Sequence, residues 1–207
     1  MKLEDILFEG PYHIGQDAPM WSSDAFMSDS SLAREYDNIG TLQRPGQSII
    51  FTFWIGKSRN VAVITTPDVD DIGQPKNRVA VHLIFKNTNS NLPIKNELQV
   101  DSVRASNEVV NMGLAGALYI VLARYGFTIV SDFTQYNGGK ALWKKLARES
   151  EARKYVVRVW DDEVSDWIKD TTGVPIKYNA ANLVDEQVWK DISQHNESTT
   201  LLALSSV

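Results

Sequence analysis

A continuous run of predicted elements between Glu97 and Asp132 constrains the fold of this 207-residue chain more than any other feature. The pattern predicts a strand over ELQVDSV (97–103), a glycine-containing turn, and a long apolar helix over about 108–124. A second strand follows and ends near Asp132. Two strands joined through a helix form a parallel pair, so the stretch predicts a β-α-β unit.

A second helix is predicted over NGGKALWKKLARES (137–150), and another strand over KYVVRVW (154–160). The order places a helix N-terminus, with its unpaired backbone N–H groups, against the end of the preceding strand. Such a terminus binds anions readily, which indicates a phosphate or pyrophosphate ligand.

The helix over 108–124 is apolar on most of its surface and is therefore expected to be buried against a sheet. Gly113 and Gly116 lie in its first turns, where each glycine costs about 1 kcal/mol relative to alanine. Two explanations stay open. Either the backbone approaches a ligand closely there, or small residues let the helix pack near the strands.

Three strands are predicted before this unit. SIIFTFWIG (48–56) and NVAVITT (60–66) read as a hairpin, and RVAVHLIFKN (78–87) places Val79, Val81, Leu83 and Phe85 on one face. PDVDDIGQPKN between them is a turn-rich loop. The predicted fold class is α/β (α+β), with a mixed, mainly antiparallel central sheet flanked by helices.

The chain is expected to form a single domain over 1–207. Residues 1–46 are the least regular, with a short helix that begins near Ser30 and Ser31. The C-terminal extension, 161–207, contains two candidate short helices (164–168 and 184–192) and a final strand, LLAL. That strand is expected at an open sheet edge or between splayed strands.

Composition limits the function classes. The net charge of −5 disfavours broad nucleic-acid binding, and the absence of cysteine excludes disulfides and thiolate chemistry. No apolar run approaches the length of a membrane span, and the first residues lack a signal-peptide pattern, so a cytoplasmic location is expected. No metal site is predicted, because His13, His82 and His195 lack ligand spacing and the acidic loop 68–73 reads as a solvated turn.

Two motifs follow the predicted strand 97–103, VNMGLAGAL (110–118) and NGGKALWKKL (137–146). The first is similar to the pyrophosphate-binding turn after the fourth strand of the GNAT acyltransferase superfamily, and the second to the next helix of that family. The resemblance covers about 78–160, and the combination also looks like uncharacterised acetyltransferase-like proteins of phage and mobile elements. It implies an acetyl-coenzyme A or other acyl-coenzyme A cofactor, held by Val103, Met112, Gly113, Leu114, Ala115, Gly116 and Asn137.

Two positions depart from the family pattern. Val110 stands where the turn carries glutamine or arginine, so anion binding would depend on backbone N–H groups and the helix dipole. Arg104 is a candidate cation at the strand end. Trp143 stands where a tyrosine often acts as general acid, and an indole N–H does not protonate a thiolate. Trp143 is therefore read as a packing residue.

Acyl transfer to an amine needs a base and an acid. Asp101 is the candidate base, and a solvated or capping aspartate is the alternative. Tyr136 is the candidate acid, with a surface or packing role as the alternative. Asn137 is expected at the cofactor's pantetheine amides or in an Asn-Gly turn, and Asp132 as a site residue or a cap.

The second helix carries a basic stripe, which reads either as a solvated face or as a contact to the phosphorylated adenosine of coenzyme A: Lys140, Lys144, Lys145 and Arg148. The leading functional hypothesis is an acyl-coenzyme A-dependent N-acyltransferase of unknown acceptor, in the host cytoplasm if phage-encoded. The alternative is a catalytically inactive GNAT-like phage protein that serves as a macromolecular binding or structural module.

Overall fold

The computed structural model of the chain describes residues 26–43, 46, 48–69, 72–86, 91–133, 137–189, 191–192 and 197–207. At Asn111, Asn137, 191–192 and 197–198 the description covers the backbone alone. The chain consists of two units. Unit 1 comprises residues 1–85 and 102–121, and unit 2 comprises residues 86–101 and 122–207.

Unit 1 is built on a sheet in which β2, β3, β4, β5 and β6 are neighbours in that order, with β1 paired antiparallel to β5. The β2–β3, β3–β4 and β4–β5 pairs are antiparallel as well. The strand bounds are β1 Phe26–Met27, β2 Tyr36–Gln43, β3 Ile50–Gly56, β4 Val61–Val69, β5 Pro75–Lys86 and β6 Glu97–Ala105.

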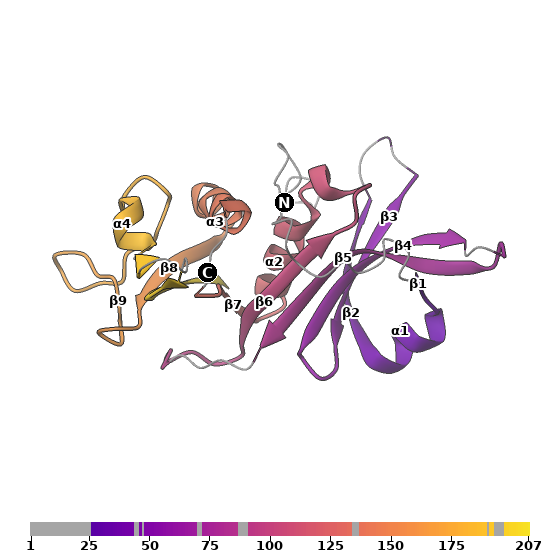
Figure 1. The fold of residues 1–207 in the computed structure, drawn as a ribbon, viewed down its shortest axis with the longest axis horizontal. Coiled ribbons are helices and arrows are strands. Elements are labelled where there is room, and N and C mark those ends of the chain that lie inside the picture. The colour runs from indigo at the N-terminus through magenta and orange to yellow at the C-terminus, as the bar shows by residue number, and fades with distance from the viewer. Residues whose placement is uncertain are drawn as a thin grey trace. The chain divides into compact units, whose positions relative to one another are not determined.

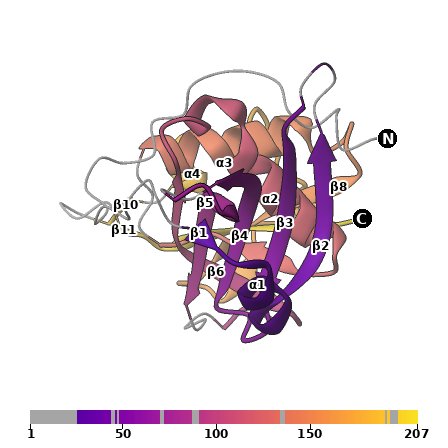
Figure 2. The ribbon, with the colours of Figure 1, turned by 90° about the vertical axis from the view of Figure 1, so that its right-hand side faces the viewer.

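Two helices belong wholly or mainly to unit 1, α1 (Asp29–Glu35) and α2 (Leu114–Arg124), and the 3-10 helix η2 (Val110–Met112) precedes α2. Figure 2 shows α2 along one face of the strands. Eight consecutive residues of α2, from Ala117 to Arg124, include seven that are buried, which confirms the predicted burial of this apolar helix. The alternation predicted for β5 is confirmed from Val81 to Phe85, where Val81, Leu83 and Phe85 are buried, but not before it, since Ala80 is buried and Val79 only half-buried.

The β4–β5 hairpin is longer than predicted and extends past its neighbours (Figure 1). The sequence between Pro67 and Asn77 was expected to form a loop, yet Pro67 pairs with Asn77 and Val69 with Pro75. A proline lacks the N–H that an inner strand must donate. Pro67 is tolerated because, among the described residues, β3 pairs with β4 only over 62–65, so no N–H of Pro67 is needed for that pairing.

Unit 2 contains the first half of β6 and four further strands of the sheet, in the order β6-β7-β12-β8-β9. β6 and β7 are parallel, as predicted, and pair over Glu97–Gln99 and Thr128–Val130. The bounds are β7 Thr128–Val130, α3 Asn137–Glu149, β8 Tyr155–Asp161, β9 Asp166–Trp167, α4 Asp185–Val188, β10 Asp191–Ile192, β11 Glu197–Ser198 and β12 Thr200–Ser206. β10 and β11 form a separate antiparallel pair.

The predicted final strand is confirmed as β12, which pairs antiparallel with both β7 and β8. Among the described residues the sheet has ten strands, mostly antiparallel, so the α+β class is confirmed. Strands rather than helices dominate the chain. α2, expected as a long helix over about 108–124, has 11 residues, and α3 has 13.

One prediction near the C-terminal end is wrong, and one strand near the N-terminal end was not predicted. Residues 164–168 do not form a helix, because Asp166 and Trp167 pair with β8 as the short strand β9. β2 lies within the segment 1–46 that was expected to be least regular. Its polar composition and a register shift between Asn38 and Gly40 hide the alternation that identifies a strand.

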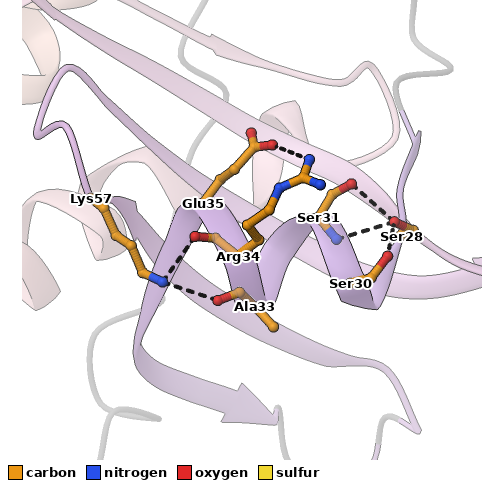
Figure 3. A network of polar contacts seen from close by, with 7 residues as sticks. All are labelled: Ser28, Ser30, Ser31, Ala33, Arg34, Glu35 and Lys57. Carbon is orange, nitrogen blue, oxygen red and sulfur yellow. Dashed lines mark hydrogen bonds and ion pairs between the residues drawn. The ribbon is translucent and has the colours of Figure 1, made fainter.

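α1 is held at both ends by polar contacts (Figure 3). Ser28 caps its N-terminus, where the hydroxyl accepts a hydrogen bond of 3.2 Å from the Ser31 N–H. At the other end Lys57, from the β3–β4 turn, donates to the carbonyls of Ala33 (3.1 Å) and Arg34 (2.9 Å). A lysine at this end also interacts favourably with the helix dipole, so Lys57 ties the hairpin to α1.

We expect Lys57→Met to lower the free energy of unfolding by about 0.3–1 kcal/mol, because two C-terminal carbonyls lose a charged donor. Arg34→Met is the matched control. It removes the exposed Arg34–Glu35 ion pair and a charge in the last turn of α1 but leaves both carbonyls bonded to Lys57, so it should lower stability less than Lys57→Met. Urea unfolding compares the two variants, and equal losses would contradict a capping role for Lys57.

Candidate functional site

The candidate site of unit 1 is the turn that joins β6 to α2. Ser106, directly after β6, donates its N–H to the Ala80 carbonyl of β5 at 2.9 Å. The chain then reverses twice, through hydrogen bonds from Val109 N to the Ser106 carbonyl (3.0 Å) and from Met112 N to the Val109 carbonyl (2.9 Å). These successive short turns fix the path of the backbone into α2.

Gly113 makes the transition from η2 to α2 in the left-handed conformation, with φ 66° and ψ 14°. The helix predicted from residue 108 therefore begins at Leu114, and Gly113 precedes it instead of lying in its first turn. A side chain at Gly113 would meet nothing within 4 Å, so packing does not require glycine here. The left-handed backbone does, since it disfavours residues with a Cβ.

The turn presents its backbone to solvent while one side chain anchors it. Met112, Gly113, Ala115 and Gly116 are half-buried, and Leu114 is only 1% exposed. The first N–H groups of a helix lack intrahelical acceptors. Those of α2 therefore lie on partly accessible backbone with open space beside Gly113, an arrangement that suits an anion.

Val103 and Arg104 precede this turn on β6, and both are half-buried in unit 1. His82 lies on β5, paired with Val63 of β4. Burial, reinforced by the positive charge of Arg104, lowers the pKa of His82 below its usual value of 6.5. The His82 side chain thus lies on a strand beside a cation, and this environment favours its neutral imidazole form.

The remaining predicted site residues lie in unit 2 or outside the described residues. Asp101 is exposed on β6, and its carboxylate has no ion pair or hydrogen bond with the part of the chain that the structure describes. Asn137 is the first residue of α3, with a described backbone only. Tyr136 lies outside the described residues.

Trp143, on α3, is 2% exposed and belongs to the core of unit 2. Its predicted role as a packing residue is confirmed, and its indole is not placed to exchange protons with a ligand. Val110, in η2, is half-buried and adds no charge to the turn.

The basic stripe on α3 is not a plain solvated face. Lys144 forms an ion pair of 2.6 Å with Asp185 of α4, and Lys145 lies 3.9 Å from Glu149. The Lys140 ammonium lies 5.7 Å from the centre of the Trp189 ring. Lys140 and Lys144 therefore contact the C-terminal segment of unit 2, a role that neither interpretation of the sequence included, whereas Lys145 pairs within α3 and Arg148 is exposed.

Two polar contacts near the end of β7 were not predicted from the sequence, Lys86 with Asp132 and Gln99 with Ser131. Asp132, predicted as a site residue or a cap, forms a partly buried ion pair of 2.5 Å with Lys86 and accepts the N–H of the next residue, Phe133, at 2.7 Å. The residues that it would cap, 134–136, lie outside the described residues. Gln99 is fully buried and donates to the Ser131 carbonyl at 3.3 Å. This amide bridges β6 and β7 where their backbone pairing stops. A glutamine inside the apolar run LQV was its only sequence signal.

Neither a metal-binding cluster nor a membrane-spanning helix is found in the described residues. No group of three or more histidine, aspartate or glutamate side chains there is placed to hold a metal ion. None of the helices in the described part is long and apolar enough to cross a membrane. Asp68, expected in a solvated acidic turn, is instead 2.5 Å from Arg78.

The lowered pKa of His82 predicts a pH dependence of stability. Because the folded pKa lies below the unfolded one, the contribution of His82 is fully present above about pH 6.5 and is lost as the pH falls through the folded pKa. We expect the free energy of unfolding of His82→Gln to fall less between pH 7.5 and pH 5 than that of the wild type. Urea titrations at both pH values measure this, and parallel losses would refute it.

Comparison with known proteins adds no relative. No protein-family model matches the chain, and neither curated proteins nor solved structures give a significant match.

Proposed function

We propose that this chain binds an acyl-coenzyme A and transfers the acyl group to an amine, as a GNAT-like N-acyltransferase. The observation that carries the proposal is the turn Met112–Gly116, where a left-handed Gly113 leads half-exposed backbone into the start of α2. Amides at such a terminus stabilise negative charge by about 0.3–1 kcal/mol per charge, and a diphosphate offers more than one charge.

The order of elements supports the same proposal. A strand (β6), the turn, a buried helix (α2), a parallel strand (β7), a second helix (α3) and a further strand (β8) follow one another, in the order that the GNAT resemblance implies. β6 continues for six residues beyond Gln99, its last partner residue with β7. Where this pairing ends, β6 has no strand partner on that side among the described residues.

In the proposed reaction the amine nitrogen attacks the thioester carbonyl carbon, the carbon–sulfur bond breaks, and the coenzyme leaves as a thiolate. A base must take the amine proton and an acid must protonate the thiolate. Asp101 is the proposed base, since its exposed carboxylate has no partner among the described residues. Tyr136 stays the proposed acid on the sequence alone.

A second function, a binding module without catalysis, is favoured by one observation. The position of the family's tyrosine carries the buried indole of Trp143, which cannot supply a proton. In this alternative the turn binds a coenzyme or a phosphorylated partner without acyl transfer.

Coenzyme A should raise the thermal midpoint of the wild-type protein, because a ligand at 100 times its dissociation constant adds about 2.7 kcal/mol of stability. Gly113→Val should abolish the shift through strain in the turn. Gly173→Val is the matched control, since Gly173 also has a positive φ (84°) and open space around it. Both variants should lose about 1 kcal/mol of stability. An unchanged shift in Gly113→Val would show that the ligand binds elsewhere.

A measurement of thiol release distinguishes the acyltransferase from the binding module. With acetyl-coenzyme A and a panel of amines, we expect the wild type to release free thiol, and Asp101→Asn to release it about 10²- to 10⁴-fold more slowly with unchanged coenzyme affinity. Coenzyme binding without thiol release for any amine would favour the binding module. Equal rates for Asp101→Asn and wild type would remove Asp101 as the base.

A further inference from the structure

Arg78, on β5, holds two carboxylates from different parts of unit 1. Its Nη1 lies 2.6 Å from each carboxylate oxygen of Glu108, and its Nε lies 2.5 Å from Oδ2 of Asp68. Its guanidinium carbon lies 5.7 Å from the centre of the Phe26 ring on β1. The Arg78 side chain is 24% exposed, so contacts on several sides fix its orientation.

Glu108 lies in the loop that leads into the candidate turn. Ser106 attaches that loop to Ala80 through a backbone hydrogen bond, and Glu108 attaches it to Arg78, two residues earlier on β5. Val109, the next residue, is buried, and its carbonyl accepts the Met112 N–H. Only these short turns separate Glu108 from Gly113, so a displacement of Glu108 is passed on to the turn.

We propose that Arg78 is a positioning residue for ligand binding, which fixes the turn Met112–Gly116 through Glu108. This inference rests on the proposed function, since it assigns Arg78 a part in coenzyme binding at the same turn. Without the ion pair, the loop gains conformations that a bound diphosphate must then exclude, and that ordering weakens binding. Glu108 is 67% exposed, so solvent screens the pair and the effect is moderate.

Isothermal titration with coenzyme A tests this on the full chain. We expect Glu108→Gln and Arg78→Met to weaken binding about threefold to tenfold. The thermal midpoint without ligand should stay close to that of the wild type in Glu108→Gln, and should fall in Arg78→Met, because that variant also loses the contacts to Asp68 and Phe26. Arg78→Lys keeps the charge and should restore part of the affinity. The matched control is Asp37→Asn, which breaks the 3.4 Å Arg59–Asp37 ion pair on the β2–β3 side of unit 1. It should bind like the wild type.

Amide exchange measured by NMR distinguishes a local loosening of the turn from a general loss of stability. In ligand-free Glu108→Gln the amides of 110–116 should exchange faster, while those of β3 keep their wild-type protection. If the wild type binds coenzyme A and both Glu108→Gln and Arg78→Met bind it equally well, the positioning role is wrong and the proposed function stands. If the wild type does not bind coenzyme A, the proposed function fails and the inference fails with it.

Discussion

The parallel pairing of β6 with β7 is the constraint on which the rest of the structure depends. Two consecutive parallel strands cannot be joined by a tight turn, so the chain between them must cross over, and α2 makes the crossing. Leu114 and every residue from Ala117 to Ala123 are buried, which agrees with the apolar sequence of the helix. A helix in this place must begin near the end of β6, and so the turn at Gly113 follows from the connection itself.

Much of this framework could be predicted from the sequence, because it is encoded locally. The apolar helix, the helix from Asn137, the strand after it and the strands from Ser48 onward all carry a period of 2 or 3.6 residues. Their positions agree with the structure to within a few residues, apart from the start of α2. There the sequence between Glu108 and Met112 fits a helix, but these residues form a turn and the 3-10 helix η2, and the left-handed Gly113 separates η2 from α2. The sequence alone does not show whether a glycine has a positive or a negative φ.

The long-range ion pairs within each unit could not be predicted, since they join residues far apart in the chain. Arg78 and Glu108 are separated by 30 positions, and Lys86 and Asp132 by 46. Each of these side chains belongs to a type that is usually solvated, and nothing nearby in the sequence marks a partner. The short strands β1 and β9 were missed for a related reason. With two residues each, they exist only through their neighbours.

The place of β12 in unit 2 has a consequence for synthesis of the protein. β7 and β8 are not neighbours in the sheet, because residues 200–206 lie between them and bridge both. During synthesis β7 and β8 leave the ribosome before β12, because their shared partner lies tens of residues later in the chain. Until then each has an unpaired edge of main-chain donors and acceptors. A nascent or truncated chain is thus open at this point to strand pairing with another copy.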